Sequence, residues 1–530
     1  MPAALMINGC DTTAPRGTSL FACAASAGVR VPTSCQMQGK CKECMVEVTE
    51  GMDCLSPVSE PERHLSGNFR LSCRAFVDCD EGRIRCHTMR RGHMRIDRAA
   101  VGLPVRTSDL TRYAPSATPV YGIAMDLGTT TVVVRLFDLA TGELIADASF
   151  ENPQRFGGSD VMSRIHYDSG HGAKLLRRTL AGYLSHAIEE FPVDPKTIRE
   201  MVVVGNSTMR DLFFRQSVYS IGQSPYRSIT EIQMAEGKRT STSLTETGRR
   251  CLLPIDPQAH VWGAPIISGH VGADAAACML AVDLAHEDRL VAIMDIGTNT
   301  ELIVGNKHRI LAASCPAGPA FEGGAIACGM PALDGAIEST TLMDDGTFRV
   351  GVIGDTAPEG ICGSGLVSLM SELLRRGRMN EMGRFLDDEH RIVLDEERGI
   401  FFTEADVNEL AQAKGANVAG LHVVFSNIGI DFDDIDVFYL AGGFGRHLAV
   451  EASKRIGLIP NIPESRIVQV GNAAIEGASI ALLSQSKRDE LEALVRRVEH
   501  CRLETHPQFF DFFVEGCQFK PVESLREVAG

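Results

Sequence analysis

Residues 120–134 read Val120-Tyr-Gly-Ile-Ala-Met-Asp126-Leu-Gly128-Thr129-Thr130-Thr131-Val132-Val-Val134. An apolar run ends at an aspartate, a turn rich in glycine and threonine follows, and a β-branched run leads away. This pattern predicts two buried strands joined by a phosphate-binding turn. Gly128 lets the backbone approach phosphate oxygens, the three threonines can donate hydrogen bonds to them, and Asp126 can hold a Mg²⁺-bound water.

The same pattern returns at residues 291–304, which read Val291-Ala-Ile-Met-Asp295-Ile-Gly297-Thr298-Asn299-Thr300-Glu301-Leu-Ile-Val304. One such turn is a weak signal, but two turns in one chain predict duplicated halves that close on a single nucleotide. Asp295 then corresponds to Asp126. Glu301 is a weaker candidate for the site, because an acidic residue that opens a strand can simply be a solvated edge.

A third motif, at residues 436–446, reads Asp436-Val-Phe-Tyr-Leu-Ala441-Gly442-Gly443-Phe444-Gly445-Arg446. It predicts a strand that ends in a glycine turn, where adenine and ribose can lie against bare backbone. A Gly-Gly pair alone fits an ordinary turn or helix cap equally well. The order of the three motifs is what favours a nucleotide site that includes Gly442, Gly443 and Gly445.

In this order the motifs resemble the superfamily of acetate and sugar kinases, heat-shock 70 ATPases and actin, over about residues 121–485. The resemblance implies two α/β lobes around a cleft, expected at residues 121–290 and 291–485, with connecting helices near residues 360–365 and 471–477. It implies ATP and Mg²⁺ in the cleft. Asp126 and Asp295 are then the candidates for orienting Mg²⁺ and the attacking water.

Upstream of this region, Cys35, Cys41, Cys44 and Cys73 form a Cys-x5-Cys-x2-Cys loop followed by one distant cysteine. Four thiolates that converge on one volume suit a [2Fe-2S] cluster, and Gly39 permits the tight turns that such a loop needs. Zinc is the alternative, although zinc ribbons usually supply two Cys-x2-Cys pairs and this region has one. We interpret the neighbouring cysteines as small buried apolar residues, namely Cys10, Cys23, Cys54, Cys79 and Cys86.

The surroundings of the cysteines predict strands at residues 5–7, 45–48 and 84–87, and a short helix within residues 18–28. Residues 1–90 therefore resemble a plant- or adrenodoxin-type [2Fe-2S] ferredoxin, with the first cysteine gap of the adrenodoxin-like branch. The expected fold class is α/β and multidomain. It consists of an α+β ferredoxin-like (β-grasp) domain followed by a two-lobed actin-like ATPase.

Length and charge limit the remaining possibilities. A chain of 530 residues exceeds what one core usually supports. The net charge of −16 comes mainly from the part after residue 120, which disfavours nucleic acid and anionic membranes as partners. No apolar run is long enough to span a membrane and no export signal precedes the first domain, so we expect a cytoplasmic protein.

Two segments flank the ATPase. Residues 91–120 are interrupted by the turn-forming stretches Arg91-Gly92, Gly102-Leu-Pro104 and Ala114-Pro115-Ser-Ala-Thr-Pro119 and are weakly periodic, which indicates a linker. Residues 486–530 form a C-terminal extension that opens with a charged helix at 487–497. This extension carries Phe509-Phe-Asp-Phe-Phe513, interpreted as an apolar edge packed on the ATPase.

A ferredoxin domain joined to this ATPase resembles the reductive activators of corrinoid-dependent methyltransferases. The resemblance includes the sequence motifs at residues 202–209, 315–324 and 440–445. The likeness leaves out the last 45 residues. It implies an ATP-dependent protein that passes one electron from its cluster to the Co(II) corrinoid of a methyltransferase corrinoid protein and so restores Co(I). An upstream low-potential electron donor is implied as well, and a homodimer is suggested by the likeness alone.

Three alternatives stay open at this point. The protein could be a small-molecule kinase with a redox-sensing ferredoxin domain, or an electron carrier regulated by nucleotide. A third possibility is a [4Fe-4S] ligand at Cys362, as in dehydratase activators of the same superfamily. That cluster needs a second nearby cysteine, so we interpret Cys362 as a packed thiol.

Overall fold

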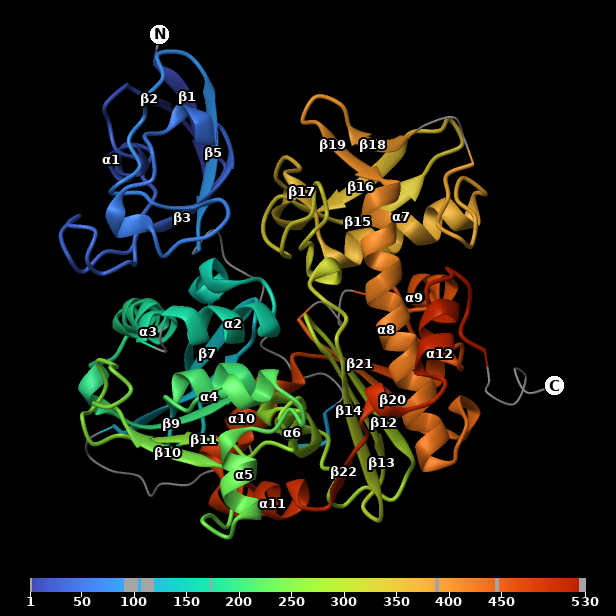
Figure 1. The fold of residues 1–530 in the computed structure, drawn as a ribbon. Helices are drawn as coiled ribbons and strands as arrows, with labels where there is room; N and C mark the ends of the chain where they lie inside the picture. Colours follow the sequence, from blue (N-terminus) through green and yellow to red (C-terminus); the bar gives the residue numbers. More distant parts are fainter. Residues whose placement is uncertain are drawn as a thin grey trace.

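The structure is a computed structural model that describes residues 2–89, 103–105, 119–171, 174–386, 390–443 and 448–523. Figure 1 shows the N-terminal domain in blue beside a green lobe, with a second lobe in yellow to red next to it. The linker predicted at residues 91–120 lies almost entirely outside the described residues. In the described ranges, no helix combines the length and apolar character needed to cross a membrane.

The N-terminal domain is built on a mixed sheet in the order β2-β1-β5-β3-β4. Its strands are β1 (Ala3–Ile7), β2 (Cys10–Ala14), β3 (Met45–Glu50), β4 (Phe69–Leu71) and β5 (Arg83–Thr88). The central pair β1 and β5 is parallel, and the other pairs are antiparallel. Helix α1 (Leu20–Ser26) begins after Ser19, whose side chain accepts a hydrogen bond from the amide of Ala22. The predicted helix and strands of this domain are confirmed.

Lobe I contains a sheet in the order β10-β11-β9-β6-β7-β8. Its strands are β6 (Tyr121–Leu127), β7 (Thr131–Asp138), β8 (Leu144–Glu151), β9 (Ile198–Gly205), β10 (Leu244–Thr247) and β11 (His260–Gly263). Its helices are α2 (Val161–His171), α3 (Lys174–Glu189), α4 (Ser207–Phe213), α5 (Ile229–Ala235) and α6 (Ala273–Ala281).

Lobe II contains a sheet in the order β21-β20-β12-β13-β14-β22. Its strands are β12 (Val291–Ile296), β13 (Thr300–Gly305), β14 (Ile310–Cys315), β20 (Val437–Ala441), β21 (Ile467–Gly471) and β22 (Val498–His500). Smaller sheets add β15 (Ala336–Leu342), β16 (Phe348–Val352), β17 (Gly360–Ile361), β18 (Arg391–Asp395) and β19 (Ile400–Thr403). The helices are α7 (Gly363–Arg375), α8 (Glu404–Ile428), α9 (Val450–Ile456) and α12 (Phe509–Gly516).

The two large sheets repeat one arrangement. In lobe I, β6 pairs antiparallel with β7 and parallel with β9. In lobe II, β12 pairs antiparallel with β13 and parallel with β20. Each predicted phosphate turn therefore joins the first two strands of a corresponding sheet, as expected for duplicated halves.

The chain crosses back to lobe I after β21. Helices α10 (Ala473–Leu483) and α11 (Gln485–Val495) lie among the green helices of lobe I in Figure 1. Helix α10 packs so closely against α6 that a Cβ added at Gly477 would lie 2.0 Å from the Ala277 carbonyl oxygen. Helix α12 instead packs along α8, with Phe509 and Phe512 against the core of lobe II.

Candidate functional site

The loop from Cys35 to Cys44 is coiled tightly by residues in the left-handed region. Gln36, Met37, Gly39 and Lys42 have φ values of 49°, 62°, 70° and 67°. Left-handed residues reverse the chain over short distances and turn their amides inward. Cys44 and Cys73 are buried, with their sulfurs 3.2 Å apart.

Amides of the loop converge on the sulfurs. Burial raises the pKa of Cys35, but hydrogen bonds from Cys41 and the amides of Lys40 and Gln38 outweigh it and bring that pKa to about 7. A hydrogen bond from the Cys44 thiol lowers the pKa of Cys73, and the Gly39 amide lowers it further. Burial acts in the opposite direction, and the resulting pKa is about 7. All four predicted thiols lie close enough to Lys42 to interact with its ammonium group. The donor set fits an anionic iron-sulfur cluster held by four thiolates.

Of the cysteines interpreted as buried, Cys23, Cys54 and Cys86 are buried and Cys79 is half-buried. The interpretation is wrong for Cys10, which is exposed in β2 at the edge of the sheet. Cys362 is a packed thiol, as predicted, because it is buried and its sulfur lies 3.3 Å from both the Ile337 carbonyl oxygen and the Ser364 hydroxyl.

The cluster loop is docked on helix α3 of lobe I. The Tyr183 hydroxyl donates to the carbonyl oxygen of Glu43 at 2.8 Å, and His186 lies 3.2 Å from the Glu43 carboxylate. Burial raises the pKa of Glu43, but hydrogen bonds with His186 and Ser34 outweigh it and hold that pKa below its usual range. A hollow of about 330 Å³ separates Cys35 and Cys41 from α3.

Between the lobes lies a cavity of about 200 Å³. All of the predicted nucleotide-site residues that the structure describes line it: Asp126, Gly128, Thr129, Thr130, Thr131, Asp295, Gly297, Thr298, Asn299, Gly442 and Gly443. Gly445 lies outside the described residues.

Close backbone packing explains two of the turn glycines, Gly128 and Gly442. A Cβ added at Gly128 would lie 2.6 Å from the Thr131 carbonyl oxygen, closer than such atoms can approach. Gly442 has φ 110°, and a Cβ there would lie 2.3 Å from the Ile296 carbonyl oxygen. The first turn is also supported from outside, because the Asn152 side chain donates to the Gly128 carbonyl oxygen at 2.8 Å.

Carboxylates gather on the floor of the cavity. Burial raises the pKa of Asp126 to about 6, against a hydrogen bond from Asn472, and burial together with the charge of Asp126 raises that of Asp295 to about 7. Burial also raises the pKa of Asp274 to about 7 and that of Glu301 well above its usual range. Carboxylate oxygens in such a group are the ligands that Mg²⁺ prefers.

Glu301, the weaker candidate, lines the cavity and is not a solvated edge, because the residue is buried and its carboxylate accepts a hydrogen bond from Ser314 at 3.2 Å. Sequence reasoning also missed Asn206, Asp274, Glu322 and Asn472, which line the same cavity. The sequence did contain a signal that could have identified the two asparagines, Asn206 and Asn472, as site residues. Each follows a strand and caps the next helix, and each side-chain amide reaches a motif residue, Thr129 or Asp126, at 2.8 Å.

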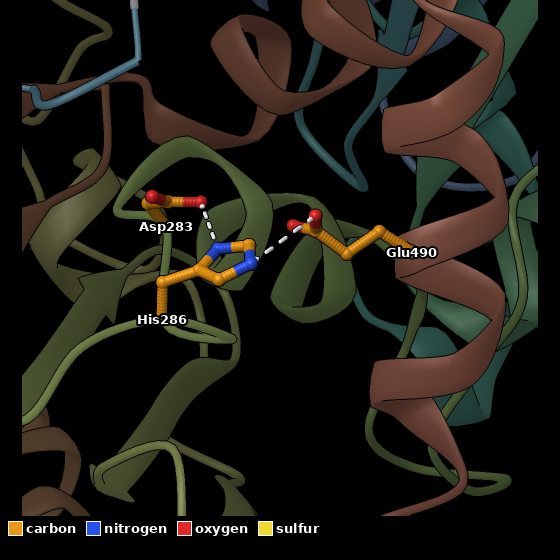
Figure 2. Close-up of side chains that lie close together, drawn as sticks. All are labelled: Asp283, His286 and Glu490. Atoms are coloured by element: carbon orange, nitrogen blue, oxygen red, sulfur yellow. Dashed lines mark hydrogen bonds and ion pairs between the residues drawn. The ribbon is translucent and has the colours of Figure 1, made fainter.

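A separate acidic group lies where α11 meets the segment after α6. Figure 2 shows His286 between Asp283 and Glu490, with its two ring nitrogens directed to different carboxylates, at 3.0 Å and 3.9 Å. Lys487 already pairs with both carboxylates, since its ammonium lies 2.8 Å from Asp283 and 3.0 Å from Glu490. The arrangement is an ion-pair network that fastens α11, rather than a set of ligands around one point.

Fold and site together define a class of protein, in which a ferredoxin-type cluster domain is joined to an actin-like two-lobed ATPase. A family model for the 2Fe-2S iron-sulfur cluster binding domain matches residues 6–78, which supports the [2Fe-2S] interpretation over zinc. Two further models match the rest: the RACo middle region at residues 121–287, and the C-terminal domain of RACo, the ASKHA domain, at residues 289–527. The chain belongs to the RACo family.

Named relatives agree with this assignment. The chain is 33% identical to the corrinoid activation enzyme RamQ of Eubacterium limosum, over 76% of this chain and 70% of the relative. It is 25% identical to a Co(II) methylated amine-specific corrinoid protein reductase of Methanosarcina barkeri, over 78% and 80% of the two chains. A solved reductive activator for corrinoid, iron-sulfur protein superposes with a TM-score of 0.70, at 25% identity over 98% of each chain. The likeness thus extends to residue 527, and the expectation that it leaves out the last 45 residues is wrong.

Proposed function

We propose that this protein restores Co(I) in the corrinoid protein of a methyltransferase system by passing one electron from a [2Fe-2S] cluster to Co(II), under the control of ATP. The observation that carries the proposal is the presence of both sites in one chain of this family. A loop with three cysteines and inward amides, completed by the distant Cys73, lies in one domain. A nucleotide cavity lined by both phosphate turns lies in the next.

Energetics explain why the two sites belong together. Plant-type [2Fe-2S] clusters have potentials near −400 mV, and each 100 mV of uphill transfer costs about 2.3 kcal/mol for one electron. Reduction of a cobalt centre with a still lower potential therefore requires a change in the partner or a source of energy. Nucleotide binding can supply it only if ATP changes the affinity between the two proteins, since a ligand that binds two states equally shifts neither.

The residues of the cavity fit defined roles in this scheme. The turns at Gly128 and Gly297 would hold the phosphates through their backbone amides and threonine hydroxyls, and the Gly442-Gly443 turn would receive the adenosine. Asp126 and Asp295 would position Mg²⁺ through its bound waters and orient the water that attacks the terminal phosphate. When bound, Mg²⁺ would neutralise the charge that develops on the phosphates.

The residues of the cluster domain fit their role as well. Cys35, Cys41, Cys44 and Cys73 would hold the cluster, and Cys35 and Cys41 would lie on its open side, next to the hollow facing α3. We propose that an upstream low-potential donor reduces the cluster. A homodimer stays a prediction, which sedimentation equilibrium would test.

The test is a reduction assay under anoxic conditions. Reduced protein is mixed with a Co(II) corrinoid protein and the Co(I) absorbance is followed with and without MgATP. We expect Co(I) to accumulate with ATP in the wild type, and Asp126→Asn to lose the ATP stimulation. Equal Co(I) yields with and without ATP would refute the proposal, and phosphate transfer to a sugar or carboxylic acid would favour a kinase instead.

A further inference from the structure

Two threonines predicted to bind phosphate are engaged with each other in this structure. Thr130 comes from the turn between β6 and β7, and Thr298 from the turn between β12 and β13. Their hydroxyl oxygens lie 3.0 Å apart across the cleft. The hydroxyls of the two lobes thus meet directly where a phosphate would otherwise separate them.

A third group completes the contact. The Glu322 carboxylate accepts a hydrogen bond from Thr130 at 3.0 Å and a second, short one from Thr298, both at the same oxygen. Glu322 ends a short 3-10 helix, Ala320–Glu322, and Gly323 follows it with φ 83°. One carboxylate oxygen therefore takes up the hydroxyl donors of both phosphate turns, as an oxygen of a nucleotide phosphate would.

Glu322 and a phosphate exclude one another at this position. Both are anions and both need the same two donors, so a phosphate that binds the threonines has to displace the carboxylate. Burial raises the pKa of Glu322, while the hydrogen bonds from Thr298 and Thr130 and the charges of Arg155 and Arg164 act in the opposite direction.

Arg155 connects this position to the cluster domain. It lies in a 3-10 helix, Pro153–Gly157, directly after β8. Its guanidinium is 3.0 Å from the Glu151 carboxylate and 3.3 Å from that of Glu47, which belongs to β3 of the N-terminal domain. The guanidinium also interacts electrostatically with Glu322.

The backbone beside Arg155 joins the same parts of the molecule. The Glu151 amide donates to the carbonyl oxygen of Met89 at 3.1 Å, directly after β5 of the cluster domain. The Asn152 amide donates to the carbonyl oxygen of Thr130 at 2.7 Å. Residues 151–155 thus contact the first phosphate turn on one side and the cluster domain on the other.

We propose that Glu322 is a latch that mimics a nucleotide phosphate, and that ATP releases it toward Arg155. The released carboxylate then competes with Glu47 for the Arg155 guanidinium and weakens one tether between the cluster domain and lobe I. The proposal rests on the proposed function only in assuming that the cleft binds nucleotide. It assigns Glu322 a role before chemistry, which differs from that of a residue that orients the attacking water.

The experiment compares the dissociation constant of a magnesium complex of non-hydrolysable ATP in the full-length wild type and in variants, by titration calorimetry. Glu322→Gln removes the competing charge, and we expect it to bind the analogue about tenfold more tightly, which corresponds to about 1.4 kcal/mol. Glu47 belongs to the other domain, and Glu47→Gln removes the carboxylate that competes for Arg155. Arg155 is then more available to the released Glu322, so we expect this variant to bind the analogue about threefold more tightly. In the Glu322→Gln background the same Glu47→Gln change should have no effect.

Arg30→Gln is the matched control. Arg30 and Glu190 form an exposed ion pair of 2.9 Å between the same two domains, and neither residue lines the cavity. We expect this variant to bind the analogue as the wild type does. A second readout is hydrogen exchange in β3, which we expect the analogue to accelerate in the wild type and not in Glu322→Gln.

The outcomes separate the alternatives. Unchanged or weaker binding in Glu322→Gln overturns the latch. The connection to the cluster domain is overturned if Glu47→Gln still tightens analogue binding in the Glu322→Gln background. It is also overturned if Arg30→Gln tightens analogue binding to the same extent. A wild type that binds no nucleotide at all overturns the proposed function and this inference together, whereas normal wild-type binding with an unaltered Glu322→Gln variant overturns the latch alone.

Discussion

Raising the pH from 6 to 8 should strengthen the binding of magnesium nucleotide, because the carboxyls on the cavity floor must ionise to hold the cation. Burial and the charge of Asp126 raise the pKa of Asp295 to about 7, and burial raises that of Asp126 to about 6. At pH 6, therefore, most of the Asp295 carboxyl and about half of the Asp126 carboxyl are protonated. Their protonated forms are poor ligands for Mg²⁺, so affinity increases as pH rises through this window.

The size of the effect follows from these two values. A carboxyl with a pKa of about 7 is about one-tenth ionised at pH 6 and about nine-tenths ionised at pH 8. One with a pKa of about 6 is about half ionised at pH 6 and almost fully ionised at pH 8. If both must be ionised, the affinity should be about 20-fold weaker at pH 6 than at pH 8.

Titration calorimetry with a non-hydrolysable ATP analogue and Mg²⁺ measures this dependence directly. In Asp295→Asn the pH dependence should shrink to that of Asp126 and of the nucleotide itself. The heat of binding should also vary with the ionisation enthalpy of the buffer, since protons leave when the cation enters. An affinity that stays constant between pH 6 and pH 8 would refute the assignment of these carboxyls as the cation site.

Three further variants test other parts of the structure. Cys73→Ser should lose the [2Fe-2S] EPR signal of the dithionite-reduced protein, because one of the four converging thiolates is gone. Glu476→Ala should lower the free energy of unfolding in urea by about 3 kcal/mol, since the buried guanidinium of Arg135, 2.6 Å away, would lose this carboxylate. Gly128→Ala should abolish nucleotide binding in calorimetry, because the added Cβ would lie 2.6 Å from a carbonyl oxygen of the same turn.

Each of these variants has a matched control. Cys10→Ser changes an exposed thiol and should keep the EPR signal. Glu143→Ala removes an exposed carboxylate and should leave the urea midpoint almost unchanged. Gly170→Ala adds a methyl group that meets nothing within 4 Å, outside the cavity, and should bind nucleotide normally. An EPR signal in Cys73→Ser, wild-type stability in Glu476→Ala or wild-type affinity in Gly128→Ala would contradict the corresponding prediction.

The sequence predicted the features that depend on neighbouring residues. The turns at Gly128 and Gly297 and the loop from Cys35 to Cys44 are short, and each needs glycine or cysteine at fixed spacing. Such residues leave a readable pattern, because a side chain at Gly128 would clash with the Thr131 carbonyl oxygen and because cysteine is the usual ligand of an iron-sulfur cluster. The family model for the cluster domain and the cavity between the two turns agree with that reading.

The features that the sequence did not predict depend on contacts between distant segments. The position of Glu301 fits the alternation of a strand. That alternation does not indicate whether its side chain faces Asp274 and Asp295, as it does, or water. Glu322 lies within residues 315–324, one of the stretches that resemble the corrinoid activators. Its contacts, however, come from two threonines in different lobes, which the sequence does not bring together. The return of α10 to lobe I likewise depends on the topology of the chain. Local sequence propensities predict a helix there but not the lobe against which it packs.

That return of α10 has a consequence for how the protein is made. The inner face of lobe I is covered only when residues 473–483 pack against α6 and β6, where Leu482 approaches Gly122. Domains generally fold as they leave the ribosome, starting from the N-terminus. The strands of the cluster domain and all four of its predicted cluster ligands emerge within the first 89 residues. A growing chain therefore completes the cluster domain long before its ATPase can close.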